Sequence, residues 1–326
     1  MNSRFPPLTS SDYQIDLMAD LAQMCAEELH AMGYQNITTS DPTLLCERYL
    51  NALYRRVQPR KRNFHISRQL QVPSDMQAGF ELLKKKVEDG DDLTPHLSGL
   101  LDKLEYNDPL LNAWRIHHFH LGTQPYQRNA NLVERTGPIL LAMVHDDDFY
   151  AITIASHGRD GQKDLFYDLD LIEILHENFP AMMKPFKIDG WATTPKPTNE
   201  EVKLARDNGI NLFSQTNDGS LYLPSPGFTS VGGTTKQTGL RVVYDAMLVV
   251  NSVRALERLI RDKIEALEIC FSKQGARPYR ICLTGFLNNG YVTAREESSY
   301  IGMQISVLKG PECLDVWQEI KPDSEP

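Results

Sequence analysis

Residues 108–122 read DPLLNAWRIHHFHLG, and residues 135–158 read RTGPILLAMVHDDDFYAITIASHG. Within the second segment, residues 139–144 and 149–155 are apolar runs rich in β-branched and aromatic side chains. The turn between them carries three consecutive aspartates. Two such runs joined by a short polar turn are typical of a β-hairpin. We therefore expect a hairpin here, and the rest of the domain is organised around it.

The first segment allows two interpretations. Asp108 followed by Pro109 is a helix start, with an acidic N-cap and a proline in the first turn. From residue 114 onward, however, the residues fall into two alternating sets, as they do along a strand. One set is Trp114, Ile116, His118 and His120, and the other is Arg115, His117, Phe119 and Leu121. The pattern predicts a short helical turn over 109–113 that leads into a strand over 114–121. The alternative is a single helix that ends at Gly122.

Five of the nine histidines lie in these two segments: His117, His118, His120, His145 and His157. On a strand, His118 and His120 would share one face, about 7 Å apart. Because histidine titrates near neutral pH, they can act as acid and base, and His157 at the end of a nearby strand can join them. A metal site would need a third or fourth donor at close range. Three roles therefore remain possible for these histidines: catalysis or RNA contact, metal binding, and a purely structural role.

Residues 51–70 form a basic segment without an acidic residue, in a chain whose formal net charge is -9. Its charged residues are Arg55, Arg56, Arg60, Lys61, Arg62 and Arg68. This asymmetry predicts a phosphate-contacting surface, because arginine makes bidentate contacts with phosphate oxygens. The alternative is a solvated loop whose charges pair with the acidic residues at 88–92.

The other elements follow from apolar periodicity, caps and breakers. Helices are expected over residues 11–32 (capped by Ser10 or Ser11), 42–53, 75–90, 94–104, 169–179, 198–209 and 240–270. Strands are expected over residues 63–69, 210–223, 279–287 and 300–308. The fold class is α+β, with a small antiparallel sheet packed on helices. We expect a helical extension over 1–57, the core over 58–190 and a second α+β domain over 198–326.

Composition points to a soluble cytoplasmic protein. The five cysteines are scattered without a CxxC pair, which is typical of a reducing compartment. The sequence MNSRFPPLTSSDY lacks the apolar core of a signal peptide, and ILLAMV is far too short to span a membrane.

In its order of strand, helix, helix, strand and a final hairpin, the segment 61–158 resembles the RelE/HigB/ParE toxin superfamily. There an arginine precedes the first hairpin strand, an acidic turn follows, and the second strand ends in histidine or arginine. Here Arg135 precedes the hairpin and His157 follows it. The resemblance implies a small antiparallel sheet on two helices that cleaves mRNA, often on the ribosome, without a metal or other cofactor.

By this resemblance, Arg135 would hold phosphate charge and His157 would act as acid or base. His118 and His120 on the neighbouring strand are candidates added from the residue pattern. RNA or the ribosome is the implied substrate, and an antitoxin or another regulatory protein is the implied partner. The chain differs from the superfamily by its additional helices and C-terminal domain, and it lacks the usual C-terminal run of basic catalytic residues.

Two other functions stay open. One is a binding or regulatory module that uses the same scaffold without catalysis. The other is a metal-dependent hydrolase that uses His118, His120 and a further donor. In addition, the spacing from Arg115 to His120 is similar to the R-x4-H motif of HEPN-domain nucleases, which are all-helical.

Overall fold

The computed structural model describes residues 8–9, 11–156, 169–190, 195–208, 212–224, 228–229, 238–273, 277–288, 290–307 and 314–319. Contacts group the chain into two compact units, one formed by Met1–Leu50 with Tyr244–Pro326 and the other by Asn51–Val243. Helices and mainly antiparallel sheets confirm the α+β class. These units have other boundaries than the predicted segments 1–57, 58–190 and 198–326. Residues 13–15 pair with residues 279–281, which groups the N-terminal residues with the C-terminal part of the chain.

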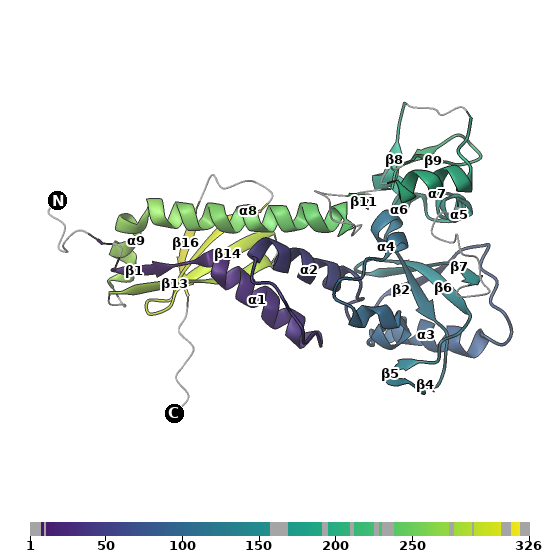
Figure 1. Ribbon diagram of the computed structural model, residues 1–326, viewed down its shortest axis with the longest axis horizontal. Coiled ribbons are helices and arrows are strands. Elements are labelled where there is room, and N and C mark those ends of the chain that lie inside the picture. Colours follow the sequence, from purple (N-terminus) through teal and green to yellow (C-terminus); the bar gives the residue numbers. More distant parts are fainter. Residues whose placement is uncertain are drawn as a thin grey trace. The chain divides into compact units, whose positions relative to one another are not determined.

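The central sheet of Asn51–Val243 has the strand order β2-β7-β6-β3 (Figure 1). Its strands are β2 (Asn63–Ile66), β3 (Ile116–His120), β6 (Pro138–Val144) and β7 (Asp148–Ser156). Strands β6 and β7 form the predicted hairpin, with Leu140 opposite Ile154, and β3 is antiparallel to β6. At the other edge, β2 runs parallel to β7, so the sheet is not wholly antiparallel.

The preferred interpretation of residues 108–122 is confirmed. Helix α4 (Pro109–Trp114) begins after Asp108, whose carboxylate accepts hydrogen bonds from the backbone N–H groups of Leu110 and Leu111. The helix ends at Arg115, and β3 follows at once. Residues 109–120 therefore form a six-residue helix that leads into a strand, and the alternative of a single helix is wrong.

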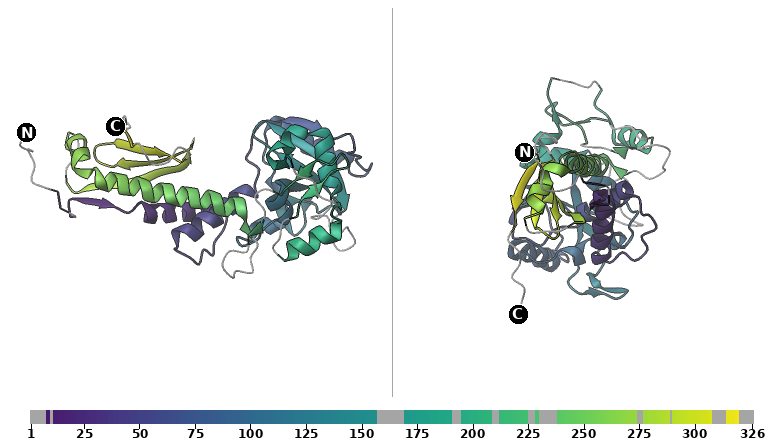
Figure 2. Two further views of the ribbon diagram at one scale, coloured as in Figure 1. Left: turned by 90° about the horizontal axis from the view of Figure 1, so that it is seen from above. Right: turned by 90° about the vertical axis from the view of Figure 1, so that its left-hand side faces the viewer.

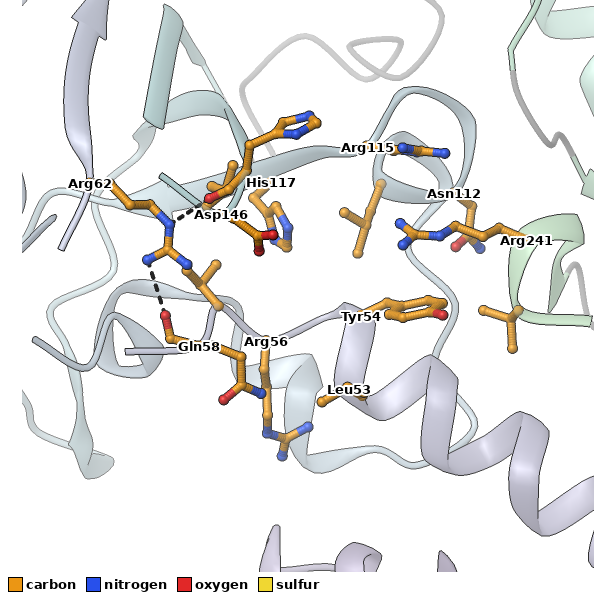
Figure 3. Close-up of a pocket in the computed structure, with 15 residues that line it drawn as sticks. Leu53, Tyr54, Arg56, Gln58, Arg62, Asn112, Arg115, His117, Asp146 and Arg241 are labelled. Carbon is orange, nitrogen blue, oxygen red and sulfur yellow. Dashed lines mark hydrogen bonds between the residues drawn. The ribbon is translucent and has the colours of Figure 1, made fainter. Parts of the chain in front are cut away.

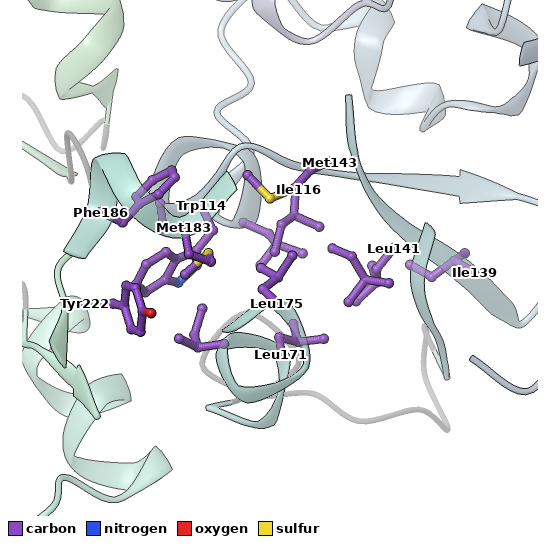
Figure 4. Close-up of a cluster of buried hydrophobic side chains, with 14 residues drawn as sticks. Trp114, Ile116, Ile139, Leu141, Met143, Leu171, Leu175, Met183, Phe186 and Tyr222 are labelled. Atoms are coloured by element: carbon purple, nitrogen blue, oxygen red, sulfur yellow. The ribbon is translucent and has the colours of Figure 1, made fainter. Parts of the chain in front are cut away.

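Two hydrophobic clusters cover the two faces of this sheet. On one face, Leu141 and Met143 pack against α4, α5 (Asp170–Asn178), α6 (Pro180–Met183) and the turn at Lys184–Phe186 (Figure 4). On the other face, Phe119 and Leu140 pack against α3 (Gln77–Asp89) and the residues that follow it. The sheet is thus buried on both sides, which explains why all five residues of β3 are buried.

The segment predicted as a helix over 94–104 is instead two short 3-10 turns. These are η1 (Thr94–His96) and η2 (Gly99–Asp102). Between them Leu97 is extended, and Ser98 caps the second turn by accepting a hydrogen bond from Leu100 N. A further small hairpin, β4 (Pro125–Tyr126) with β5 (Asn129–Val133), separates β3 from β6. The order of elements therefore departs from the strand-helix-helix-strand order on which the family resemblance was based.

The remainder of this unit consists of short elements. Strands β8 (Lys187–Ile188), β10 (Leu221–Tyr222) and β9 (Ser214–Gln215) form a small sheet, and β11 (Phe228–Thr229) pairs with β12 (Thr238–Gly239). Helix α7 (Asn199–Asp207) has the predicted capping box, because Thr198 N donates to Glu201 Oε2 and Glu201 N donates to Thr198 Oγ1.

The unit formed by Met1–Leu50 and Tyr244–Pro326 contains a five-stranded sheet. Its order is β1 (Tyr13–Ile15), β13 (Tyr279–Asn288), β14 (Tyr291–Glu296), β15 (Ile301–Ser306) and β16 (Asp315–Gln318). Its helices are α1 (Leu17–Ala31), most of α2 (Pro42–Tyr54), most of α8 (Leu240–Asp262) and α9 (Ile264–Phe271), with α8 running alongside the sheet (Figures 1 and 2). None of the helices that the structure describes has both the length and the apolarity needed to cross a bilayer.

The N-terminal helix begins later than expected. Residues 13–15 form β1, which pairs in parallel with β13 through Tyr13 and Tyr279. The cap of α1 is Asp16, whose carboxylate accepts a hydrogen bond from Ala19 N at 2.9 Å. Ser11 therefore precedes the strand rather than capping the helix, and Ser10 lies outside the described residues. Strand β14 and strand β16 were not expected from the sequence.

Candidate anion-binding site

A cavity of about 440 Å³ lies within the unit Asn51–Val243. Its walls come from the end of α2, from α4, from β3, from the turn after β6 and from the first turn of α8. Its charged and titratable lining residues, among those that the structure describes, are Arg56, Arg62, Arg115, Arg241, His117, His145 and Asp146. A cavity of this volume is large enough for a small ligand or a single nucleotide unit.

Arg62 is held in place by backbone carbonyl groups. Its Nε donates to the carbonyl oxygen of His145 at 2.7 Å, and its Nη1 donates to the carbonyl oxygens of Gln58 and Arg60 at 3.0 Å. Carbonyl groups carry no net charge, so these bonds orient the guanidinium without neutralising it. Burial is the largest effect on this group and lowers its pKa. Arginine nevertheless stays protonated at neutral pH.

Arg115 occupies an unusual backbone position. It follows the last residue of α4 with φ 59° and ψ 28°, in the left-handed region, and its N–H donates to the Leu111 carbonyl at 2.8 Å. Helices commonly end this way, but usually with glycine or asparagine, because a larger side chain costs about 1–2 kcal/mol there. Strained residues of this kind cluster at functional sites. Here the strained residue is part of the cavity lining, and its guanidinium lies 5.7 Å from the centre of the Phe186 ring.

Arg241 reaches the cavity from the first turn of α8. Its guanidinium lies 4.2 Å from the centre of the Tyr54 ring, a cation–π contact. The chain that enters α8 is held against α4 at Gly239, where an added Cβ would lie only 2.7 Å from Asn112 Oδ1. A side chain at this position would require Asn112 to shift, and the close approach at Gly239 brings Arg241 to the same cavity as Arg115.

The ring of His117 lies between Arg62 and Arg241, which are on opposite sides of the cavity (Figure 3). Burial, with smaller contributions from His118, Arg62 and Arg241, lowers the pKa of His117 to about 3. This imidazole is therefore neutral at pH 7 and can accept one hydrogen bond while it donates another. Burial is also the main cause of the lowered pKa of His145, with Arg115 acting in the same direction.

The cavity therefore combines fixed positive charge with a neutral hydrogen-bonding ring. Asp146 is the acidic residue among the described lining residues, and its carboxylate lies 3.4 Å from the exposed guanidinium of Arg60. Guanidinium groups bind carboxylate and phosphate through paired N–H donors, and they remain charged when partly buried. An arrangement of this kind is suited to binding an anionic group.

The histidines chosen from the sequence lie elsewhere. His118 and His120 do share a face of β3, opposite Leu141 and Ile139, and each is 7% exposed. His118 Nδ1 lies 3.3 Å from the Asp108 carboxylate. Among the described residues that line the arginine cavity, neither His118 nor His120 is present.

The other two catalytic candidates are not brought to the cavity either. Arg135 donates from Nη1 to the Leu97 carbonyl at 2.6 Å and from Nη2 to the Pro95 carbonyl at 3.3 Å. These contacts hold the chain of the two 3-10 turns. His157 lies outside the described residues. Among the described residues, His118 lines a small second cavity together with Arg55 of the basic segment and Asp108, but neither Arg135 nor His120 lines it.

The predicted phosphate-binding segment is divided among several roles. Arg56 and Arg62 line the cavity. Arg55 is 4% exposed and donates to the backbone carbonyls of residues 100 and 103, so it has a structural position. Arg60 pairs with Asp146 and Asp147 of the hairpin turn rather than with the acids at 88–92, and Lys61 is exposed.

Sequence reasoning missed Arg241, noted Arg115 only as part of an R-x4-H spacing, and placed His117 only within a cluster. The signal for Arg115 was its position directly after a capped six-residue helix, where a left-handed residue is common. The described residues contain no group of three His, Cys, Asp or Glu side chains placed to hold a metal ion.

No family model, no curated protein and no solved structure matches the chain. The cavity itself therefore has to support any functional assignment.

Proposed function

We propose that the unit Asn51–Val243 binds RNA and holds one of its phosphate groups in the arginine cavity. The observation that carries this proposal is that Arg56, Arg62, Arg115 and Arg241 all line one cavity of about 440 Å³. Contacts of arginine and lysine with phosphate provide a large share of the affinity of proteins for nucleic acids. In a chain whose net charge is -9, this group of arginines is a local concentration of positive charge to which an anion can bind.

Two features support a nucleotide unit rather than a bare anion. The ring of Tyr54 lies beside Arg241 in the cavity lining, and RNA bases stack on aromatic rings and guanidinium planes. His117 is neutral at pH 7, so it can accept a hydrogen bond from a ribose 2'-hydroxyl, the group that distinguishes RNA from DNA.

Equilibrium binding of a fluorescent single-stranded RNA to the full-length chain tests this proposal. Arg241→Gln should weaken binding about 10-fold or more, because it removes a charged contact. Arg128→Gln is the matched control, since Arg128 is an exposed arginine of the same unit, outside the cavity lining. Equal effects of the two substitutions would mean that RNA binds by general charge attraction, and the cavity would lose its assigned role.

Cleavage of the bound RNA remains a prediction of the family resemblance. It is tested by incubating the same RNA with the protein in the presence of EDTA. If the resemblance holds, the wild-type protein cleaves RNA and His157→Ala does not. A protein that binds RNA but leaves it intact would instead act as the binding module that was the alternative function.

A further inference from the structure

Helix α8, which runs alongside the five-stranded sheet (Figure 2), is exposed along one side. Its buried side includes Ala246, Val249, Val253, Leu256 and Ile260. Between residues 244 and 258 the exposed positions form a line, the α8 stripe, which consists of Tyr244, Met247, Asn251, Arg254 and Arg258. Tyr244 is 59% exposed and Met247 is 52% exposed, although both side chains are large and mainly apolar. The exposed side of a surface helix is usually polar, so two such neighbours point to a contact with another molecule.

The spacing of the α8 stripe is that of a helix-pairing seam. Its residues follow one another at alternating intervals of three and four positions. This is the spacing of positions a and d in a coiled coil, which keeps one line of side chains against a partner helix. Tyr244 and Asn251 then occupy position a, and asparagine at a single position a is known to set the register of paired helices. The stripe therefore has the pattern of a seam about two heptads long.

The two ends of the α8 stripe differ in charge. Tyr244 and Met247 form an apolar end, and Arg254 and Arg258 form a basic end. Within the part of the chain that the structure describes, neither of these two arginines forms an ion pair. If two copies paired in parallel, each arginine would face its own counterpart, and the like charges would repel each other. If they paired antiparallel, the basic end of one copy would lie against the apolar end of the other.

One antiparallel register satisfies the whole stripe. With Tyr244 opposite Arg254 of a second copy, Met247 lies opposite Asn251, because the two pairs of residue numbers have the same sum. Each pair joins a position a to a position d, as a reversed helix requires when a and d alternate along the seam. A guanidinium is attracted to the face of a tyrosine ring, and its methylene stem covers apolar surface. The two-fold symmetry of such a pair provides the same contact twice.

We propose that the α8 stripe is an interface between two copies of this chain, which pair their α8 helices antiparallel around a two-fold axis at the level of Val249. The stripe lies in the unit formed by Met1–Leu50 and Tyr244–Pro326, so this inference is independent of RNA binding by the arginine cavity. Each copy already holds α8 as a folded helix, so pairing does not have to order it. A seam of about two heptads is short, and the dimer should form with a Kd in the micromolar range.

Light scattering during gel filtration tests the interface on the full-length chain, freed of nucleic acid, at protein concentrations from about 1 to 200 µM. The mass of the wild-type chain should rise from monomer to dimer over this range. Tyr244→Lys places a second cation opposite Arg254 and should weaken the dimer at least about 10-fold. Tyr244→Phe is the matched control, because it keeps the ring and should preserve the dimer. Circular dichroism checks that each variant is folded.

A charge exchange tests the antiparallel register. The double variant Tyr244→Lys, Arg254→Glu brings opposite charges together across an antiparallel seam, so the dimer should return. In a parallel pair the same variant would bring like charges together and stay monomeric. A monomeric double variant would therefore overturn the antiparallel pairing. A wild-type chain that is monomeric at every concentration would overturn the interface and leave the stripe to a different partner protein, and a dimer that Tyr244→Lys does not weaken would place the interface elsewhere.

Discussion

Replacing Arg115 by asparagine should abolish most ligand binding and leave the stability of the fold nearly unchanged. Arg115 has a left-handed backbone, with φ 59°. Such a backbone costs a long side chain about 1–2 kcal/mol, and asparagine adopts it more readily. The substitution also removes the contact of the guanidinium with the buried Phe186 ring, at 5.7 Å, which is worth about 0.5–2 kcal/mol. These two effects oppose each other.

The expected net change in the free energy of unfolding is therefore within about 1 kcal/mol, or about 2–4 °C in Tm. The loss of one charge-assisted contact with phosphate should weaken binding by about 1.5–3 kcal/mol, roughly 10- to 150-fold in Kd. Circular dichroism during thermal unfolding measures Tm, and fluorescence anisotropy with a labelled RNA measures Kd. Both are measured on the same protein preparation. A large fall in Tm would show that Arg115 holds the fold together. An unchanged Kd would show that the cavity does not bind the ligand.

Three further predictions concern stability and salt dependence. The pKa of His117 is about 3 in the folded state and about 6.5 in the unfolded state. Because only the unfolded state takes up the proton between these values, the free energy of unfolding should be highest above pH 6.5. It should fall by up to about 1.4 kcal/mol per pH unit as the pH decreases toward 3. Urea unfolding at pH 7.5 and 5.0 should show a smaller difference for His117→Gln, and an undiminished difference would assign the effect to other groups. Asp108→Ala should cost about 0.5–2 kcal/mol by removing the α4 cap, and Asp108→Asn should cost less; equal losses would point to the His118 pair instead. Arg241→Gln should reduce the slope of log K against log salt by about 0.7 for single-stranded RNA, whereas an unchanged slope would place Arg241 away from phosphate.

Much of the local structure was predictable because it depends on residues close together in the chain. Three aspartates between two apolar runs define the β6–β7 hairpin, and Asp108-Pro109 defines the start of α4. Thr198 and Glu201 form their capping box as expected. In each case the hydrogen bonds that decide the structure join neighbouring residues, so the pattern of side chains is sufficient.

Pairing between distant segments was not predictable in the same way. Tyr13 lies opposite Tyr279, more than 250 residues away, and three residues of β1 carry too little periodicity to indicate a strand. Buried and half-buried positions alternate along the β14 sequence YVTARE, but the strand is short and lies among polar residues. Tertiary packing decides both strands, and this information is absent from local patterns.

The candidate site shows the same limit. Alternation along β3 correctly indicated that His118 and His120 share a face, but it did not indicate which face borders a cavity. His117 lies on the other face of β3 and lines the cavity together with Arg241, which is more than 120 positions later in the chain. The basic segment was a better guide, because Arg56 and Arg62 contribute directly to the lining.

A crystal structure of the full-length chain with a short single-stranded RNA would test the central claim most directly. The account predicts that a phosphate of the RNA lies in the cavity, within hydrogen-bond distance of the guanidinium groups of Arg62 or Arg241. A strand bound elsewhere on the chain, with no part of the RNA in the cavity, would contradict it.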